Sequence, residues 1–369
     1  MTWEYIQPVR ILYGRGKRAE THSIAKELGF QRGFLVCSPF FVRNGMAEAF
    51  CKEAEGMFVD VFSDITPNPT TMAVDACAQR IRASGADFVV AVGGGSPMDL
   101  AKAAAVTATT GDSITKYHNT GVPMPNQGLP LIVLPTTSGS CSEVTSTSVL
   151  SDSRGVKASI MSPRFFPIVA IVDPELTYTV PPKVAAESGL DVLSHAIEGY
   201  MGLRHQPICD ALAIQAVRLV FAHLRAAVQG EESARDQMAQ ASLLSGLAFA
   251  LPKTGPPHAF SYGLTTHYGL SHGEACALTL DYFLELAAAK AEERLQDFAI
   301  QAGFSGVSAM AEEIRALKRD CGMLTDLKHL HLTDADIKTL VQDAMRPGMK
   351  NSPVPVTEEM LYALYETLR

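Results

Sequence analysis

The chain has 369 residues, of which 47% are apolar and 19% charged, and its formal net charge is −8. This balance is typical of a soluble globular protein, and an acidic chain without a Lys/Arg run is a poor partner for nucleic acid. The start lacks the basic and apolar segments of a signal peptide, and the longest apolar runs are far shorter than a membrane span. Seven cysteines without a CxxC pair favour reduced thiols. We therefore expect a cytoplasmic protein with no nucleic-acid or membrane partner.

The first half of the chain alternates apolar, β-branched runs with helical patterns. Strands are expected in "GFLVCS", "FVDVFS", "DFVVAV" and "LPLIVLP", and helices in "GMAEAFCKEAEG", "PTTMAVDACAQRIRASG" and "SPMDLAKAAAVTAT". Alternation of strands and helices implies parallel strands joined by right-handed crossovers. The pattern predicts an α/β domain with a doubly wound parallel sheet over residues 1–180.

The second half becomes helical after Pro181 and Pro182, which are well placed to open a helix. No β-rich run follows "IVAIVD". Helical patterns cover residues 183–201, 207–228, 231–250, 274–302, 306–321, 333–346 and 357–368. The sequence therefore predicts a second, all-α domain over residues 181–369.

Two polar turns follow predicted strands. The first contains Gly93, Gly94, Gly95 and Ser96 and opens a helix, so its backbone and the free N–H groups of the helix can approach a phosphate. The second, "LPTTSGSCSEVTST", is rich in hydroxyls. Parallel α/β sheets bind ligands at the carboxyl ends of their strands. The pair predicts a phosphate- and ribose-binding site, although GxGxxG is absent; a tight turn and a solvated loop are the alternatives.

A carboxylate and several imidazoles form a second candidate site. Asp191 and His195 are four residues apart in "SGLDVLSHAIEGY", so they share one helical face. His258, His267 and His272 follow within "PPHAFSYGLTTHYGLSHGEA". Imidazole and carboxylate together suit Fe²⁺, Zn²⁺ or similar ions. A surface or helix-capping role for the Asp/His pair remains the alternative.

A shared ion would require the chain to bend. In one continuous helix His258 and His272 would lie about 21 Å apart along the axis. Ligands must each lie about 2.0–2.2 Å from a metal ion. The chain must therefore fold back between the two histidines, and Gly263 and Gly269 offer places to do so.

These motifs together resemble the iron-containing (group III) alcohol dehydrogenases. The segments that carry the resemblance are "DFVVAVGGGSPMDLAKAAAV", "LPTTSGSCSEVTSTSVL", "IVDPELTYTVPPKVAAESGLDVLSHAIEGY" and "LSHGEACAL", in that order. The resemblance implies a Rossmann-like N-terminal domain, a helical C-terminal domain and an active site in the cleft between them. It also implies NAD(H) or NADP(H) as cofactor and a divalent metal, with Fe²⁺ the first choice and Zn²⁺ or Mn²⁺ the alternatives.

The resemblance assigns roles to individual positions. It implies metal ligands at Asp191, His195, His258 and His272. It implies pyrophosphate binding at Gly93–Ser96 with Asp99 just inside the helix. The remaining cofactor positions that it implies are Thr136, Thr137, Ser140, Lys157 and Leu176.

Three positions depart from the family pattern. Cys141 stands where the family has Gly, which is expected to alter the local turn. Tyr262 replaces a histidine with a suspected proton-relay role, so Tyr262 and His267 become the candidates for that role. Ser38 ends a strand where NAD-preferring relatives place Asp, so NADPH is not excluded electrostatically and the choice of cofactor stays open.

The implied reaction is hydride transfer between the nicotinamide and a small aldehyde or alcohol, in a homodimer or larger homo-oligomer. The segment "KTGPPHAFSYGLTTHYGLSHG" resembles relatives that reduce aldehydes with an anionic head, such as phosphonoacetaldehyde or sulfoacetaldehyde. Lys253, Arg204 and His205 could neutralise that head, with solvated side chains as the alternative. Other readings are a glycerol- or lactaldehyde-type dehydrogenase, a dehydroquinate-synthase-like lyase and a non-catalytic binding protein.

Overall fold

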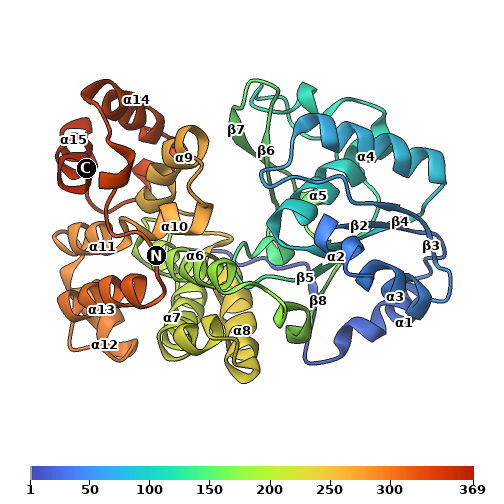
Figure 1. Cartoon of the computed structure of the whole chain (residues 1–369), viewed down its shortest axis with the longest axis horizontal. Coiled ribbons are helices and arrows are strands. Elements are labelled where there is room, and N and C mark those ends of the chain that lie inside the picture. The colour runs from blue at the N-terminus through green and yellow to red at the C-terminus, as the bar shows by residue number, and fades with distance from the viewer. Residues whose placement is uncertain (1) are drawn as a thin grey trace. The chain divides into compact units, whose positions relative to one another are not determined.

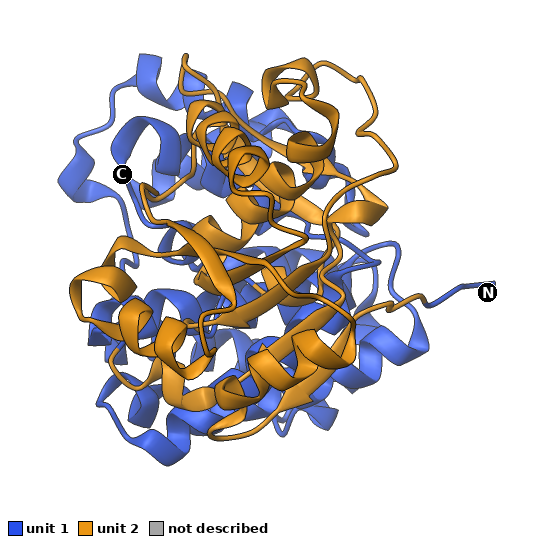
Figure 2. Ribbon diagram, turned by 90° about the vertical axis from the view of Figure 1, so that its right-hand side faces the viewer, with its two compact units in different colours: residues 1–5, 138–140, 180–369 blue, residues 6–137, 141–179 orange. Residues whose placement is uncertain are grey.

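The computed structural model describes residues 2–369, which form two compact units (Figures 1 and 2). Unit 2 comprises residues 6–137 and 141–179. Unit 1 comprises residues 1–5, 138–140 and 180–369. Unit 2 is the α/β part of the chain and unit 1 is the helical part, which confirms the predicted fold class.

Unit 2 is built on a six-stranded parallel sheet with the order β1-β8-β5-β4-β2-β3. The four predicted strands of the first half are present, and β1 is a strand that the sequence did not predict. A separate antiparallel hairpin, β6–β7, was also not predicted. The strands are β1 (Arg10–Tyr13), β2 (Gly33–Cys37), β3 (Phe58–Phe62), β4 (Phe88–Gly93), β5 (Leu131–Pro135), β6 (Thr147–Ser151), β7 (Lys157–Met161) and β8 (Val169–Val172).

Helices cover both faces of this sheet, so its central strands are apolar throughout. In β4, Val89 and Ala91 belong to one hydrophobic cluster, while Val90 and Val92 belong to another. Successive strand residues point to opposite faces, which explains why a continuous apolar run is buried on both sides. The helices are α1 (Thr21–Glu27), α2 (Pro39–Arg43), α3 (Met46–Glu53), α4 (Thr71–Ser84) and α5 (Gly95–Thr110).

Unit 1 consists of helices that share one hydrophobic cluster. Proline occupies the first turn of α6, α7 and α9, where its missing N–H costs nothing. The helices are α6 (Pro182–Met201), α7 (Pro207–Val228), α8 (Glu232–Phe249), α9 (Pro256–Tyr268), α10 (His272–Ala277), α11 (Leu280–Ala288), α12 (Glu292–Gln301), α13 (Val307–Asp320), α14 (Asp334–Ala344) and α15 (Glu358–Leu368).

The expected single helix over 274–302 is wrong, because this stretch forms α10, α11 and α12. Thr279 and Ala291 leave helical geometry at the two breaks. Neither is a Gly or a Pro, so the helical pattern of the sequence continues through both breaks. The breaks therefore follow from packing rather than from local propensity.

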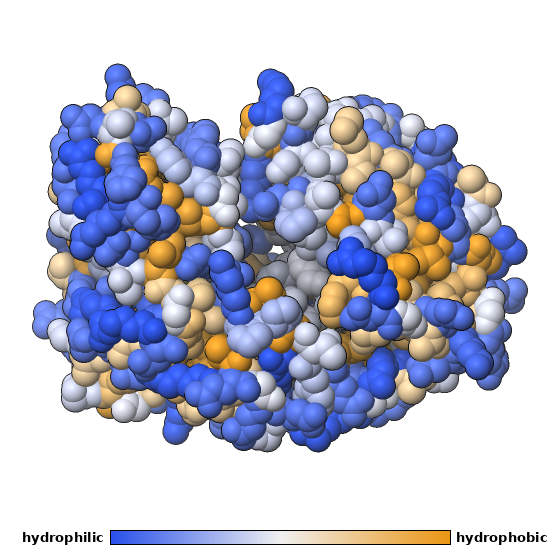
Figure 3. All heavy atoms as spheres, in the orientation of Figure 1, coloured by the Kyte–Doolittle hydropathy of each residue, from blue (hydrophilic) through white to orange (hydrophobic). Residues whose placement is uncertain are grey.

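Helix α7 is long and apolar enough, by length and composition, to cross a membrane. It packs against α6 and α8, and its buried residues belong to the cluster of unit 1. That packing accounts for the apolar residues on its buried face. On the face of the protein in Figure 3, hydrophilic side chains predominate and apolar patches lie between them.

Candidate active site

Helix α6 places three polar side chains on one buried face. Asp191, His195 and Glu198 follow one another at spacings of four and three residues, so they project from the same side of the helix. They are 5%, 5% and 0% exposed. Burying two carboxylates and an imidazole is costly unless each is paired or binds a cation.

His258 and His272 reach this face from two different helices. His258 lies in the first turn of α9, and His272 is the first residue of α10. The chain turns between them at Gly269, which adopts a left-handed conformation with φ of 69°. Gly263, the other expected bend, lies inside α9, where an added Cβ would come 2.7 Å from Leu340 Cδ2. The fold-back required for a shared ion is therefore present, at Gly269.

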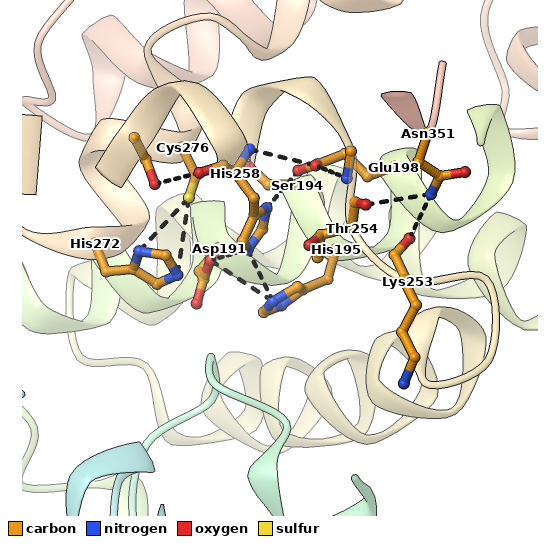
Figure 4. Close-up of polar contacts among 12 residues, drawn as sticks. Asp191, Ser194, His195, Glu198, Lys253, Thr254, His258, His272, Cys276 and Asn351 are labelled. Atoms are coloured by element: carbon orange, nitrogen blue, oxygen red, sulfur yellow. Dashed lines mark hydrogen bonds and ion pairs between the residues drawn. The ribbon is translucent and has the colours of Figure 1, made fainter. Parts of the chain in front are cut away.

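The four predicted ligands converge with a fifth donor, Cys276 (Figure 4). His258 Nε2 lies 3.0 Å from His195 Nε2 and 3.5 Å from Asp191 Oδ1. Ligand atoms of Asp191, His258, His272 and Cys276 all lie within 4.8 Å of one another. Cys276 was missed from the sequence, although it follows His272 by four residues on α10, the same spacing that identified Asp191 and His195.

This donor set fits a divalent metal ion. Ligands about 2.1 Å from a tetrahedral ion lie about 3.4 Å from one another, close to the spacings among His195, His258 and Asp191. Three imidazoles and a carboxylate suit Fe²⁺, Zn²⁺ or Mn²⁺, and a thiol adds a softer donor. Burial and the neighbouring His258 hold the pKa of His195 well below its usual value. Burial opposes protonation of His258 too, but Cys276 and Glu198 outweigh it and raise the pKa of His258 well above its usual value.

Glu198 accepts hydrogen bonds both from the ring of His258 and from the backbone at the start of α9. Its Oε1 accepts a hydrogen bond from His258 Nδ1 at 2.5 Å. Its Oε2 accepts from the backbone N–H groups of Gly255 at 2.6 Å and His258 at 3.3 Å. A carboxylate only accepts, so His258 carries its proton on Nδ1 and directs Nε2 to the cluster. Sequence reasoning missed Glu198, whose partners lie about sixty residues downstream.

His195 is held by different neighbours. Its ring stacks on Phe249 with centroids 4.1 Å apart, and it hydrogen-bonds the backbone of Gly139. Gly139 belongs to the second polar turn, and residues 138–140 are part of unit 1. A Cβ on Gly139 would lie 2.8 Å from Ser188 Cβ, so only glycine permits this approach to α6. The turn predicted to bind cofactor therefore also supports a predicted metal ligand.

The first polar turn and the start of the second lie next to each other in unit 2. Gly93 pairs with Pro135 across β4 and β5, and Thr136 N donates to Gly93 O at 3.0 Å. A Cβ on Gly94 would come 3.0 Å from Thr137 Oγ1. Gly94 is the N-cap of α5 and offers no capping side chain, so Gly95 and Ser96 begin a helix with unsatisfied N–H groups. This arrangement suits a pyrophosphate.

Other predicted cofactor residues have protein partners. Asp99 Oδ1 accepts from Ser142 Oγ at 2.6 Å, and Oδ2 accepts from Val149 N at 2.9 Å. Ser38 is the N-cap of α2, and its Oγ accepts from the backbone of Phe41. The structure thus gives both side chains a local structural role.

Two further predicted cofactor positions are also buried. Lys157 begins β7 and Leu176 belongs to a hydrophobic cluster of unit 2. Cys141 adopts φ of 55°, in the left-handed region that glycine enters freely and that a residue with a Cβ enters only at the cost of backbone strain.

A buried lysine lies behind the second turn. Lys102 Nζ donates to Ser142 Oγ at 2.6 Å and to Thr147 O at 2.9 Å, and it lies 4.0 Å from Asp99 Oδ1. Burial lowers the pKa of Lys102 to about 8. Burial raises the pKa of the neighbouring Glu143 to about 7. The network ties α5 to the polar turn and was not foreseen from the sequence.

The two candidates for proton transfer both lie on α9, after His258. His267 lies in the last turn of α9, exposed, with Nε2 2.6 Å from Asp343 Oδ2. Tyr262 is one turn beyond His258, and the Arg346 guanidinium lies 4.1 Å from the centre of its ring. Of the two, Tyr262 is nearer along the helix to the cluster.

Two family profiles match almost the whole chain. The one described as "Iron-containing alcohol dehydrogenase" matches residues 8–174. The one described as "Fe-containing alcohol dehydrogenase family, C-terminal" matches residues 185–368.

Individual proteins match over 72% to 100% of the chain. The crystal structure of sulfoacetaldehyde reductase from Bifidobacterium kashiwanohense in complex with NAD⁺ is 49% identical, with a TM-score of 0.98, and the match covers 100% of this chain and 99% of that one. Long-chain-alcohol dehydrogenase 1 of Geobacillus thermodenitrificans is 35% identical over 92% of this chain and 90% of that protein. Sulfoacetaldehyde reductase of Bilophila wadsworthia is 34% identical over 72% of this chain and 70% of that protein.

Proposed function

The chain belongs to the iron-containing alcohol dehydrogenases, which are oxidoreductases acting on CH–OH groups, and from this membership we propose that it reduces small aldehydes carrying a sulfonate. The observation that carries the redox proposal is the convergence of a carboxylate, three imidazoles and a thiol in the buried core of unit 1. The sulfonate is proposed because two of the relatives described above are sulfoacetaldehyde reductases.

We assign Asp191, His195, His258 and His272 as the metal ligands. When bound there, a divalent ion, proposed to be Fe²⁺ with Zn²⁺ or Mn²⁺ as alternatives, polarises the aldehyde oxygen, and a reduced nicotinamide supplies the hydride. Glu198 keeps His258 in the tautomer that presents Nε2. Phe249 fixes the plane of the His195 ring by stacking. Asp191 contributes a negative charge that offsets part of the charge of the ion.

We assign the cofactor to the two polar turns of the chain. Gly93, Gly94, Gly95 and Ser96 would bind the pyrophosphate through backbone N–H groups, because the three glycines carry no side chain and no side chain caps the start of α5. Thr136, Thr137 and Ser140 offer hydroxyls toward the nicotinamide side. Asp99 supports the second turn through Ser142, and Lys157 and Leu176 are proposed to line the cofactor site. NAD(H) is proposed as the cofactor, and Ser38 adds no charge that would exclude NADP(H).

The alcohol product requires one proton. We propose Tyr262 as its route, since it follows His258 by one helical turn and carries a phenolic hydroxyl. His267 is the weaker candidate because Asp343 holds its Nε2.

The setting of the enzyme is also a proposal. All seven cysteines are free thiols, which supports a reducing, cytoplasmic compartment. Large apolar side chains such as Trp3 and Ile6 are about half exposed, which supports burial in a homodimer or larger homo-oligomer. We divide the chain functionally into a cofactor-binding domain, 1–180, and a metal-binding domain, 181–369.

The test is NADH or NADPH oxidation followed by absorbance after loading with Fe²⁺, Zn²⁺ or Mn²⁺. Sulfoacetaldehyde should be reduced faster than propionaldehyde of similar size. His258→Ala and His272→Ala should abolish activity while remaining folded, whereas His329→Ala, an exposed histidine, should not. Absence of nicotinamide oxidation with every aldehyde and metal would refute the proposal and favour a lyase, which consumes no reduced nicotinamide.

A further inference from the structure

Two cations lie in loops that flank helices carrying predicted metal ligands. Lys253 lies in the segment between α8 and α9, five residues before His258, and Arg204 lies in the loop between α6 and α7. Asn351 joins the two loops. Its Nδ2 contacts the Lys253 carbonyl at 3.2 Å, and its Oδ1 accepts from Leu203 N at 3.0 Å.

The backbone at Lys253 is unusual and firmly held. Its φ is 71°, in the left-handed region that residues with a Cβ rarely adopt. Asn351 Nδ2 also contacts the carbonyls of Pro252 and Thr254, and Glu198 holds Gly255 at the other end. Backbone strain of this kind persists only where surrounding contacts hold the residue in place, and it occurs most often at ligand-binding positions.

No carboxylate in residues 2–369 forms an ion pair with the side chain of Lys253 or Arg204. The chain has 39 acidic residues against 31 basic ones, so carboxylates are not scarce. His205, the third predicted cation, is paired with Asp210 at 2.9 Å and is therefore not part of the receptor. Burial and the charge of Arg204 lower the pKa of Lys253. Two like charges that interact, one of them partly buried, are unfavourable until an anion binds between them.

We propose that Lys253 and Arg204 are the receptor for the sulfonate of the aldehyde substrate, an inference that rests on the proposed function. Because Asn351 and Glu198 hold the backbone of the segment from Lys253 to His258, the Cα of Lys253 is fixed relative to a predicted metal ligand. In Figure 4 the Lys253 side chain extends away from Asn351, and no drawn contact reaches its ammonium. A tetrahedral sulfonate offers three acceptor oxygens, enough for an ammonium and a guanidinium together.

The test compares kcat/KM for sulfoacetaldehyde with kcat/KM for propionaldehyde, with NADH, in the metal-loaded enzyme. Lys253→Met should lower this ratio about 30-fold, since a hydrogen bond between charged groups is lost. Arg204→Met should lower it about fivefold because its side chain is more exposed. Lys253→Arg should restore part of the ratio. Lys338→Met, which removes an exposed cation on α14, is the matched control and should leave the ratio unchanged.

A second readout does not depend on catalysis. Ethanesulfonate, an unreactive anion, should bind the parent in calorimetry and bind Lys253→Met at least tenfold more weakly. Equal affinity in both proteins, or equal loss of activity toward both aldehydes, would overturn the receptor. If the parent oxidises no NADH but still binds ethanesulfonate through Lys253, the proposed function fails and the anion site stands. A preference for phosphonoacetaldehyde that also depends on Lys253 would support the receptor and change the proposed substrate.

Discussion

The most informative single substitution is Glu198→Gln. It preserves the size of a fully buried side chain but removes its charge and replaces one acceptor oxygen by a donor amide. In the parent, the carboxylate accepts three hydrogen bonds, from His258 Nδ1, His258 N and Gly255 N. The amide oxygen of a glutamine can accept the hydrogen bonds that one of the two carboxylate oxygens accepts. Its NH₂ group then faces an N–H donor on the other side, and two donors form no hydrogen bond.

The expected effects follow from these contacts. Each hydrogen bond to a charged group contributes about 1.5–3 kcal/mol, so loss of at least one should destabilise the protein by about 2 kcal/mol or more. Loss of the carboxylate partner of a ligating histidine weakens metal binding about 10–100-fold. The loss of metal affinity is specific to a residue that orients a metal ligand, because a residue with a purely structural role would change stability alone.

The assay is metal affinity by competition with a fluorescent chelator, measured together with thermal unfolding. Asn351→Ala is the matched comparison, because Asn351 holds the same segment through three carbonyls without touching His258. It should lower stability while changing metal affinity less than about threefold. A Glu198→Gln protein that binds metal as tightly as the parent would refute the orienting role.

The other predictions concern the cluster, the buried network and the second turn. His195→Ala should lose the ion on dialysis while Cys276→Ser keeps it, as measured by elemental analysis; the reverse would identify the thiol as the ligand. Because burial raises the pKa of Glu143 from 4.5 to about 7, the folded protein holds an extra proton in this window and its stability falls as pH rises through it. Glu143→Gln should therefore raise Tm relative to the parent near pH 8 but not near pH 4, and an equal difference at both would contradict this sign. Gly139→Ala should weaken metal binding and lower Tm by a few degrees, since its Cβ would clash with Ser188; unchanged values of both would show that the turn adapts.

Several features of the site were predictable because they depend on local spacing. Asp191 and His195 share a helical face by their separation of four residues, and the glycine turn follows a strand and opens a helix. The need for a bend between His258 and His272 follows from helix length alone, although which glycine bends was decided by the structure. The bend is at Gly269, where α9 ends, whereas Gly263 lies inside α9 and packs against Leu340.

The rest depends on contacts between distant segments. Glu198 gains its role from residues about sixty positions away, and Asn351 contacts two loops that lie about a hundred and about a hundred and fifty residues before it in the chain. The sequence alone determined the α/β and helical halves, the two polar turns and the shared helical face of Asp191 and His195, because periodicity and short spacings encode local geometry. The resemblance to the family implied His258 and His272 as the other two ligands. Only the tertiary structure decided which side chains hold His258, which turn supports His195 and which cations remain unpaired, because these depend on how helices pack, and packing follows no fixed sequence interval.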